Sequence, residues 1–247
     1  MSSEHYSYSA YADPAMAASF DAKRFGGPIG TMLLHDQERV LADFLGDVSG
    51  RRVLDMATGT GRAALALAQR GAIVTGVDAS REMLSVARTR AADAGLSIEF
   101  REGDAHALAF QDRAFDASVC LRMLMHVPDW RRALSELCRV TAHRLVFDYP
   151  AVGSAAAIQA AWRRAAHAAG RNVEAYRVFR GADVSRELAR HGFRITADHK
   201  QFVLPIAFHK AVGSARFTRR LEGMLASAGM LRIAGSPVTI AAERCAS

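Results

Sequence analysis

The sequence predicts an α/β protein built on a doubly wound, mostly parallel sheet of seven strands, with helical lid elements near both ends. From residue 51 onwards, short apolar β-like runs alternate with helical segments, and glycines end two of these helices. Half of the 247 residues are hydrophobic, which supplies a core on both sides of a sheet. Apolar strands separated by helices of about ten to fifteen residues are typical of a parallel sheet covered on both faces.

Five β-like runs and three helices alternate in the middle of the chain. The β-like runs lie at 51–57, 73–80, 98–105, 115–124 and 143–151, and the helices lie at 61–71, 81–95 and 130–142. Gly71 ends the first of these helices and is suited to its C-cap, because glycine readily adopts the left-handed conformation found there.

The two ends of the chain have a looser pattern. Residues 1–50 are mostly helical, with a glycine-rich break at 25–30. The later segments comprise predicted helices at 157–170, 185–193 and 216–230 and β-like runs at 193–204 and 236–244. Because the last run follows a long insertion, we expect it to form a hairpin at an edge of the sheet. The length fits a single domain, with a cap at 1–50, a core at 51–150, and lid insertions and closing strands at 151–247.

Composition excludes several classes of protein. No apolar run reaches the roughly 18 residues of a membrane-spanning helix, and the N-terminus lacks the pattern of a secretory signal. Cys120, Cys138 and Cys245 have no CxxC spacing, which argues against a disulfide framework or a zinc site and favours a cytoplasmic protein. The net charge of +7 comes from the C-terminal part, but its arginines are scattered without interleaved aromatics, so nucleic acid is not an expected partner.

A glycine turn directly follows the first β-like run. In residues 53–64, VLDMATGTGRAA, a strand leads through Gly59 and Gly61 straight into a helix. Small residues are needed where a nucleoside ligand lies against the backbone at the edge of a sheet. Alone, this turn is weak evidence, because similar turns open NAD and FAD sites.

Two aspartates discriminate between these ligands. Asp55 ends the first run and Asp78 ends the second, where a carboxylate suits the two hydroxyls of a ribose. A carboxylate inside the first turn would repel the pyrophosphate of a dinucleotide, but it suits a ligand that carries an ammonium and a sulfonium. The pair therefore favours S-adenosylmethionine over NAD.

With these motifs in place, residues 52–150 resemble the core of the class I S-adenosylmethionine-dependent methyltransferases, in the small-molecule branch that includes quinone-biosynthesis enzymes. The family's four motifs match VLDMATGTG, VTGVDAS, EGDA and FDASVCLRMLMHVPDW in order, with one departure: Ala57 stands where a first glycine is usual. The resemblance implies that Asp78 binds the ribose and that Asp104 binds the adenine amino group. The cofactor-binding residues that we expect are Asp55, Ala57, Thr58, Gly59, Thr60, Gly61, Asp78, Ala79, Met83, Asp104, Ala105, Leu121 and Arg122.

His126, just past the fourth run, is the expected catalytic residue. In many family members a histidine before a VPD turn faces the methyl group, and an imidazole titrates near neutrality and accepts a proton from an attacking hydroxyl. The alternative is a turn histidine that only packs. His209 and His5 are weaker candidates for substrate contact, whereas His143 is expected in a surface helix or loop. Arg24 is a candidate for binding the methionine carboxylate, although a surface arginine is the plainer interpretation.

These features predict an enzyme that moves a methyl group from S-adenosylmethionine to a small-molecule or lipid-linked acceptor, at an oxygen. Carbon methylation of a quinone-like ring is the alternative within the family. A nucleotide-binding oxidoreductase and a non-catalytic cofactor-binding protein are the alternatives outside it. No metal is expected, because the carboxylates are not clustered as a catalytic magnesium requires. The cofactor motifs look complete without the N-terminal arm, whose Tyr6, Tyr8 and Tyr11 suggest a lid over the acceptor.

Overall fold

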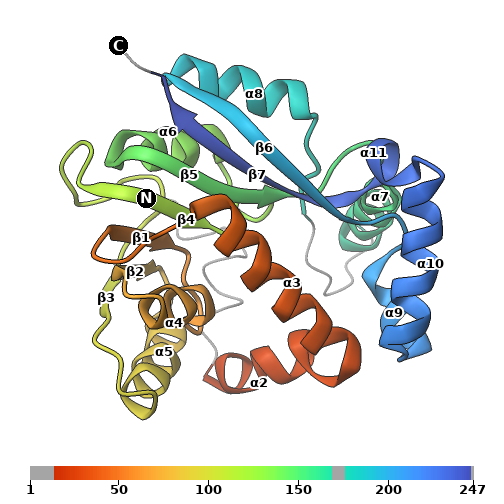
Figure 1. The fold of residues 1–247 in the computed structure, drawn as a ribbon, viewed down its shortest axis with the longest axis horizontal. Helices are drawn as coiled ribbons and strands as arrows, with labels where there is room; N and C mark the ends of the chain where they lie inside the picture. Colours follow the sequence, from red (N-terminus) through yellow and green to blue (C-terminus); the bar gives the residue numbers. More distant parts are fainter. Residues whose placement is uncertain (1–13, 169–175, 246–247) are drawn as a thin grey trace.

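The computed structural model describes residues 14–168 and 176–245, which form one seven-stranded sheet with helices on both faces (Figure 1). The strands are Arg52–Met56 (β1), Ile73–Asp78 (β2), Glu99–Glu102 (β3), Phe115–Cys120 (β4), Thr141–Tyr149 (β5), Phe193–Phe202 (β6) and Ser236–Arg244 (β7). The helices are Pro14–Phe25 (α2), Gly27–Leu45 (α3), Arg62–Gln69 (α4), Arg81–Asp93 (α5), Trp130–Val140 (α6), Ala155–Ala168 (α7), Gly181–Arg190 (α8), Ile206–Val212 (α9), Ala215–Ser227 (α10) and Met230–Ala234 (α11).

The strands lie in the order β3-β2-β1-β4-β5-β7-β6, and this arrangement confirms the predicted doubly wound sheet. β1 is central to the parallel part, where Val53 is the register partner of Val74 on β2 and of Ala117 on β4. β7 is antiparallel to both β5 and β6, so the two late strands form the expected hairpin at an edge, with β6 outermost. Because β1, β2, β4 and β5 are parallel, their carboxyl ends meet at one edge of the sheet.

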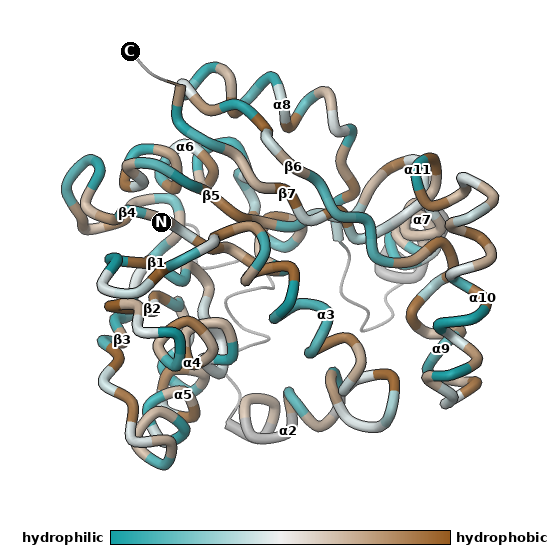
Figure 2. The backbone as a smooth tube through the Cα atoms, viewed as in Figure 1, coloured by the Kyte–Doolittle hydropathy of each residue, from teal (hydrophilic) through white to brown (hydrophobic). Residues whose placement is uncertain are grey.

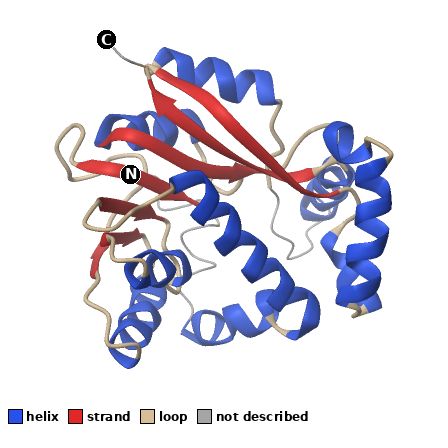
Figure 3. Cartoon of the chain, viewed as in Figure 1, coloured by secondary structure: helices blue, strands red, loops and turns tan. Residues whose placement is uncertain are grey.

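Side chains of the strands alternate between two cores, one on each face of the sheet. Leu54, Leu145 and Phe147 point into the core that α6 and α8 cover. Their neighbours Val53 and Val146 point into the core that α3, α4 and α5 cover. Figure 3 shows these helices on opposite sides of the sheet. Both cores are closed by apolar helix faces, which is why the strands read as nearly continuous apolar runs.

β6 is one of the two edge strands of the sheet and has only β7 as a neighbour. Between its buried ends, exposed and half-buried residues alternate along the first part of the sequence FRITADHKQF. Figure 2 shows the resulting hydrophilic edge strand beside the more hydrophobic β5 and β7. An edge strand of this kind does not present a flat apolar surface to other chains.

A group of helices lies beyond the carboxyl edge of the sheet. α2, the start of α3, α7, α9 and α10 surround this edge, and Ile29, Met32, Leu33 and Phe202 form a small core among them. The far end of α3 is instead part of the main core, where Leu41 and Leu45 are buried. Residues 1–50 are therefore more than a cap. Across the described part of the chain, the helices lack the combination of length and hydropathy that a bilayer-spanning helix needs.

Candidate functional site

The turn between β1 and α4 forms the floor of the site. Asp55 at the end of β1 is buried, and its Oδ2 accepts hydrogen bonds from the Thr58 hydroxyl at 2.6 Å and from the Ala64 backbone N–H at 3.0 Å. Both bonds fasten the turn to the strand below it. The Asp55 carboxylate therefore holds the turn in place, and its expected contribution to cofactor binding stays a prediction.

Backbone conformation explains the small residues of this turn. Ala57, Gly59 and Gly61 have φ angles of 57°, 55° and 81°, which lie in the left-handed region. A side chain at Gly61 would also place its Cβ 3.0 Å from the Cβ of Ala87 on α5. Ala57 therefore occupies a conformation that favours the glycine usual in the family, at an expense of about 1 kcal/mol.

Asp78 at the end of β2 links two loops of the site. Its Oδ2 accepts a hydrogen bond from the Gly59 backbone N–H at 2.8 Å, and its Oδ1 accepts one from the Ser80 backbone N–H at 2.9 Å. Ser80 in turn caps α5, because its hydroxyl accepts from the Met83 backbone N–H at 3.0 Å. Burial raises the pKa of Asp78, while these backbone donors oppose the shift. The carboxylate is held in one orientation by groups of the chain itself.

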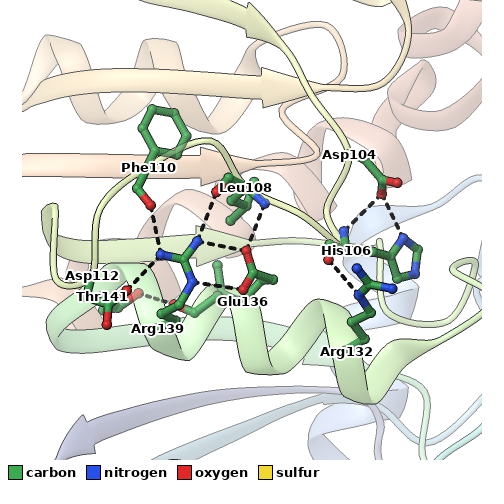
Figure 4. Close-up of polar contacts among 10 residues, drawn as sticks. Asp104, His106, Leu108, Phe110, Asp112, Arg132, Glu136, Arg139 and Thr141 are labelled. Carbon is green, nitrogen blue, oxygen red and sulfur yellow. Dashed lines mark hydrogen bonds and ion pairs between the residues drawn. The ribbon is translucent and has the colours of Figure 1, made fainter. Parts of the chain in front are cut away.

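Asp104, after β3, is oriented by its neighbour. Its Oδ1 lies 2.7 Å from Nδ1 of His106 and 2.9 Å from the backbone nitrogen of the same residue (Figure 4). Arg132 on α6 donates a hydrogen bond to the His106 carbonyl, and Arg139 donates to the carbonyls of Leu108 and Phe110. These hydrogen bonds attach the loop after β3 to α6. His106 therefore positions Asp104.

These loops enclose a cavity of about 160 Å³ at the carboxyl edge of the sheet. Eleven of the thirteen expected cofactor residues line it: Ala57, Thr58, Gly59, Thr60, Asp78, Ala79, Met83, Asp104, Ala105, Leu121 and Arg122. The other two, Asp55 and Gly61, lie outside its wall. The four motifs, which are separated in sequence, thus meet around one space.

A larger cavity of about 450 Å³ adjoins the first. Phe20, Arg24, Arg122 and His126 line both cavities, so they form the wall where the two spaces meet. His126 is 7% exposed and lies in the loop that follows β4. The larger cavity continues under α7 and α9, away from the motifs of the core.

Residues 53–144, which form most of the smaller cavity, match the family described as methyltransferase domain. A ubiquinone biosynthesis O-methyltransferase from Alkalilimnicola ehrlichii is 40% identical over 131 residues, which are 50% of this chain and 53% of that protein. A demethylmenaquinone methyltransferase from Thermus thermophilus is 44% identical over 105 residues, which are 40% of this chain and 48% of that protein. The chain thus spans about half the length of the curated relatives it matches.

The crystal structure of a magnesium protoporphyrin IX methyltransferase from Synechocystis extends the likeness to the whole fold. It aligns with a TM-score of 0.67 over 97% of this chain and 98% of that one, at 17% identity. Residues 53–144 therefore form a methyltransferase domain, and the chain as a whole has the fold of that methyltransferase. At 17% identity the structural likeness shows the fold alone.

α2 is attached directly to the turn between β1 and α4, which we call the cofactor turn. The carboxylate of Asp21 accepts a hydrogen bond from the Thr60 hydroxyl at 3.0 Å, lies 3.3 Å from Nε of Arg62 and contacts Arg90 on α5. Arg62 also stacks on Phe25, with its guanidinium carbon 3.4 Å from the ring centroid. The smaller cavity is thus lined by Phe20 and Arg24 of α2 as well as by the motifs, so the expectation that the cofactor site needs no part of the N-terminal arm stays a prediction to be tested. The expected contributions of Tyr6, Tyr8 and Tyr11 lie outside the described residues.

The remaining histidines of the protein are less suited to chemistry than His126. His209 is fully buried, with its Nε2 2.8 Å from Oε1 of Glu222 and its Nδ1 3.1 Å from the Thr218 hydroxyl. Contrary to the expectation, it therefore does not reach the acceptor space. Glu222 also accepts from the backbone nitrogens of Val203 and Leu204, and the cluster thereby anchors one wall of the larger cavity. His143 lies on β5, as part of the fifth predicted β-like run, and not on a helix or loop. Within the described ranges, no cluster of His, Cys, Asp and Glu is arranged to hold a metal ion.

Sequence reasoning missed several residues of the site. Phe20, Arg62, Val77, Gly103 and Met123 line the smaller cavity but were not among the expected residues. Val77 and Gly103 directly precede Asp78 and Asp104 and lie inside the matched motifs VTGVDAS and EGDA, so the motifs themselves were the signal for them. Phe20 comes from α2, and no signal in the sequence indicated where that helix packs.

The buried carboxylate of Asp55 makes the stability of the ligand-free protein depend on pH. Burial raises the pKa of Asp55 from 3.8 to about 6. The folded protein keeps this proton to a higher pH than the unfolded chain does, and this difference stabilises the folded protein at low pH. The stabilisation is complete below pH 3.8 and is lost as the pH rises through about 6. Asp55→Asn keeps an oxygen acceptor and removes the charge. We expect it to raise the free energy of unfolding at pH 7 by about 1–3 kcal/mol, and by much less near pH 4.

Urea denaturation of both proteins between pH 4 and pH 7 measures this difference. Asp43→Asn, at an exposed position on α3, is the control and should leave the difference close to zero throughout. A difference between Asp55→Asn and the wild type that stays constant with pH would mean that Asp55 titrates alike in both states.

Proposed function

We propose that the protein is an enzyme that transfers a methyl group from S-adenosylmethionine to an oxygen of a small-molecule acceptor. The observation that carries this proposal is the junction of the two cavities, where His126 lies on the shared wall. The smaller cavity would hold the cofactor, and the larger cavity would hold the acceptor. A cytoplasmic location is part of the proposal and agrees with the three free cysteines.

The smaller cavity has groups that suit each part of the cofactor. At one end, the Asp78 and Asp104 carboxylates are available for the ribose hydroxyls and the adenine amino group, and Ala79, Ala105 and Met83 supply apolar contact. At the other end, Arg24 and Arg122 suit the carboxylate of the methionine portion. The small residues of the turn leave room for the ligand against the backbone.

The bound cofactor supplies an activated methyl group, so the residues of the chain have to position the acceptor, exclude water and take up a proton. His126 lies between the two cavities, where its imidazole would accept the proton of the acceptor hydroxyl. Phe20 and Phe25 of α2, held by Asp21, would keep water from the junction. The named activity of the O-methyltransferase relative supports oxygen as the acceptor atom.

Incubation with trideuteromethyl-labelled S-adenosylmethionine and a library of phenols, catechols and acids tests this function. Mass spectrometry is expected to find the labelled methyl group on at least one hydroxylated acceptor, and not when Asp78→Ala replaces the wild type. Label on carbon, shown by its resistance to ether cleavage, would contradict oxygen transfer. If the cofactor stays unchanged with every class of acceptor, the proposal that the protein is an enzyme is contradicted.

Asp78→Ala is expected to weaken S-adenosylmethionine binding by about 1.5–3 kcal/mol, the scale of hydrogen bonds to a charged group. The variant removes the proposed ribose ligand and also the acceptor for the Gly59 backbone N–H. Isothermal calorimetry measures the affinity. Asp116→Ala is a matched control, because Asp116 also accepts a backbone N–H, from Arg52 at 2.8 Å, but at the start of β1. Unchanged affinity in a folded Asp78→Ala protein would remove Asp78 from the site.

A further inference from the structure

The larger cavity has both an apolar and a charged part. Phe25, Phe202 and Ile206 contribute apolar side chains to its wall. The charged residues among the described lining are Arg24, Arg122, Arg163 and Lys210, against the single carboxylate of Asp148. These four cations come from α2, the loop after β4, α7 and α9, so the fold brings them together from separate parts of the chain.

Asp148 offsets only part of this charge. It is buried at the end of β5, and its Oδ1 accepts a hydrogen bond from the backbone nitrogen of Arg122. Burial raises the pKa of Asp148, and the charges of Arg122 and Arg24 oppose that shift. Among the described residues that line the cavity, cationic side chains therefore outnumber carboxylates, and such a wall favours an anion inside it.

The cations act on one region of the cavity. Burial lowers the pKa of Lys210, and the charges of Arg24 and Arg122 lower it further. Burial raises the pKa of Tyr176, and the charges of Arg163 and Arg122 oppose that shift. The Tyr176 hydroxyl donates a hydrogen bond to the Ala156 carbonyl at 3.1 Å. Arg122 is thus close to both Lys210 and Tyr176. Like charges gathered in a partly desolvated space repel one another, and a bound anion relieves that repulsion.

The four cations divide into two pairs by position. Arg24 and Arg122 line both cavities, whereas Arg163 and Lys210 line only the larger one. The carboxylate of the proposed cofactor accounts for the first pair. Lys210 is held beside α2, because its Nζ donates to the Arg24 carbonyl at 2.9 Å, and Arg163 lies over the Tyr176 ring with 5.7 Å to the centroid. The second pair is therefore placed for a group on the acceptor itself.

We propose that the acceptor is an amphipathic acid, whose carboxylate or phosphate is bound by Arg163 and Lys210 and whose apolar body lies against Phe25, Phe202 and Ile206. This inference rests on the proposed function for the assignment of the larger cavity to the acceptor. Binding of an anion to Arg163 and Lys210 is nevertheless measurable without methyl transfer, so the two proposals fail separately.

A pair of fluorescent probes tests the anionic requirement. 8-Anilinonaphthalene-1-sulfonate is an amphipathic anion, and N-phenyl-1-naphthylamine is the same aromatic skeleton without the sulfonate. Both are titrated into the protein with and without S-adenosylhomocysteine. Arg163→Gln and Lys210→Gln are each expected to lower the affinity for the anionic probe about 5- to 20-fold, near the low end for a hydrogen bond to a charged group, and to leave the neutral probe within twofold.

Two further variants keep this test specific. Arg164→Gln removes a neighbouring, exposed arginine of the same helix and should leave both affinities unchanged. Arg163→Lys should recover part of the anionic affinity, which a merely structural role of Arg163 would not predict. Anionic affinity within twofold of the wild type in both folded glutamine variants would overturn the proposal, whether or not labelled methyl transfer is observed.

Displacement of the anionic probe identifies the acidic group. Benzoate and phenyl phosphate are compared with neutral benzamide. Displacement by benzoate alone indicates a carboxylic acid, and displacement by phenyl phosphate alone indicates a phosphate ester. Equal displacement by benzamide would contradict an anionic acceptor.

Discussion

Replacing His126 with alanine is expected to lower the turnover of methyl transfer by about 10²–10⁴-fold, the usual contribution of a general base. The imidazole lies on the wall shared by the two cavities and is 7% exposed, so it is screened from bulk water. A hydroxyl is a weak nucleophile until its proton leaves, and no carboxylate other than Asp148 lines the larger cavity within the described residues. The affinity for S-adenosylmethionine should change little.

Labelled-methyl kinetics and calorimetry on the same preparations separate these two effects. His143→Ala is the matched control, because His143 is exposed on β5 and lines neither the cofactor cavity nor the acceptor cavity. Its turnover should equal that of the wild type. Turnover of His126→Ala within a few-fold of the wild type would show that His126 only packs or orients its loop.

Asp21→Ala is expected to weaken cofactor binding about 10- to 100-fold and to lower the free energy of unfolding by about 1–3 kcal/mol. The Asp21 carboxylate is 17% exposed and joins α2 to Thr60, Arg62 and Arg90. Without it, two cations are left close together, and the helix that carries Phe20 and Arg24 loses its attachment to the cofactor turn.

Calorimetric titration and urea denaturation measure these two quantities. Asp36→Ala removes a carboxylate from an exposed pair with Arg39 on α3, at 3.6 Å, and serves as the control with an expected change below about 0.5 kcal/mol. Equal cofactor affinity in folded Asp21→Ala and Asp36→Ala would show that α2 is a lid that the cofactor site does not need.

The fold and most of the smaller cavity followed from local patterns. Alternation of apolar runs and helices predicted a doubly wound, mostly parallel sheet, because parallel strands need covering helices on both faces. Asp78, Asp104 and the turn at Gly59 lie at strand ends, and parallel strands bring their carboxyl ends to one edge. Short motifs therefore sufficed for this part of the site.

Features that depend on tertiary packing did not follow from the sequence. Asp55 was expected among the cofactor residues, but the sequence did not indicate that its carboxylate accepts hydrogen bonds from Thr58 and Ala64 of the same turn. The docking of α2 through Asp21 joins residues far apart in the chain, and no local pattern indicates it. In the sequence, Arg163 is one of many scattered arginines, and only the fold shows that it lines the larger cavity. The periodicity of apolar residues predicts which face of a helix is buried, but it does not predict the element against which that face packs.

Calorimetric titration of the wild-type protein with S-adenosylhomocysteine, and separately with NAD, tests most directly whether the smaller cavity is a methyl-donor site. The account predicts one molecule of S-adenosylhomocysteine bound per chain with a micromolar dissociation constant, and no saturable heat from NAD. Binding of NAD as tight as that of S-adenosylhomocysteine, or no binding of S-adenosylhomocysteine by the folded protein, would contradict it.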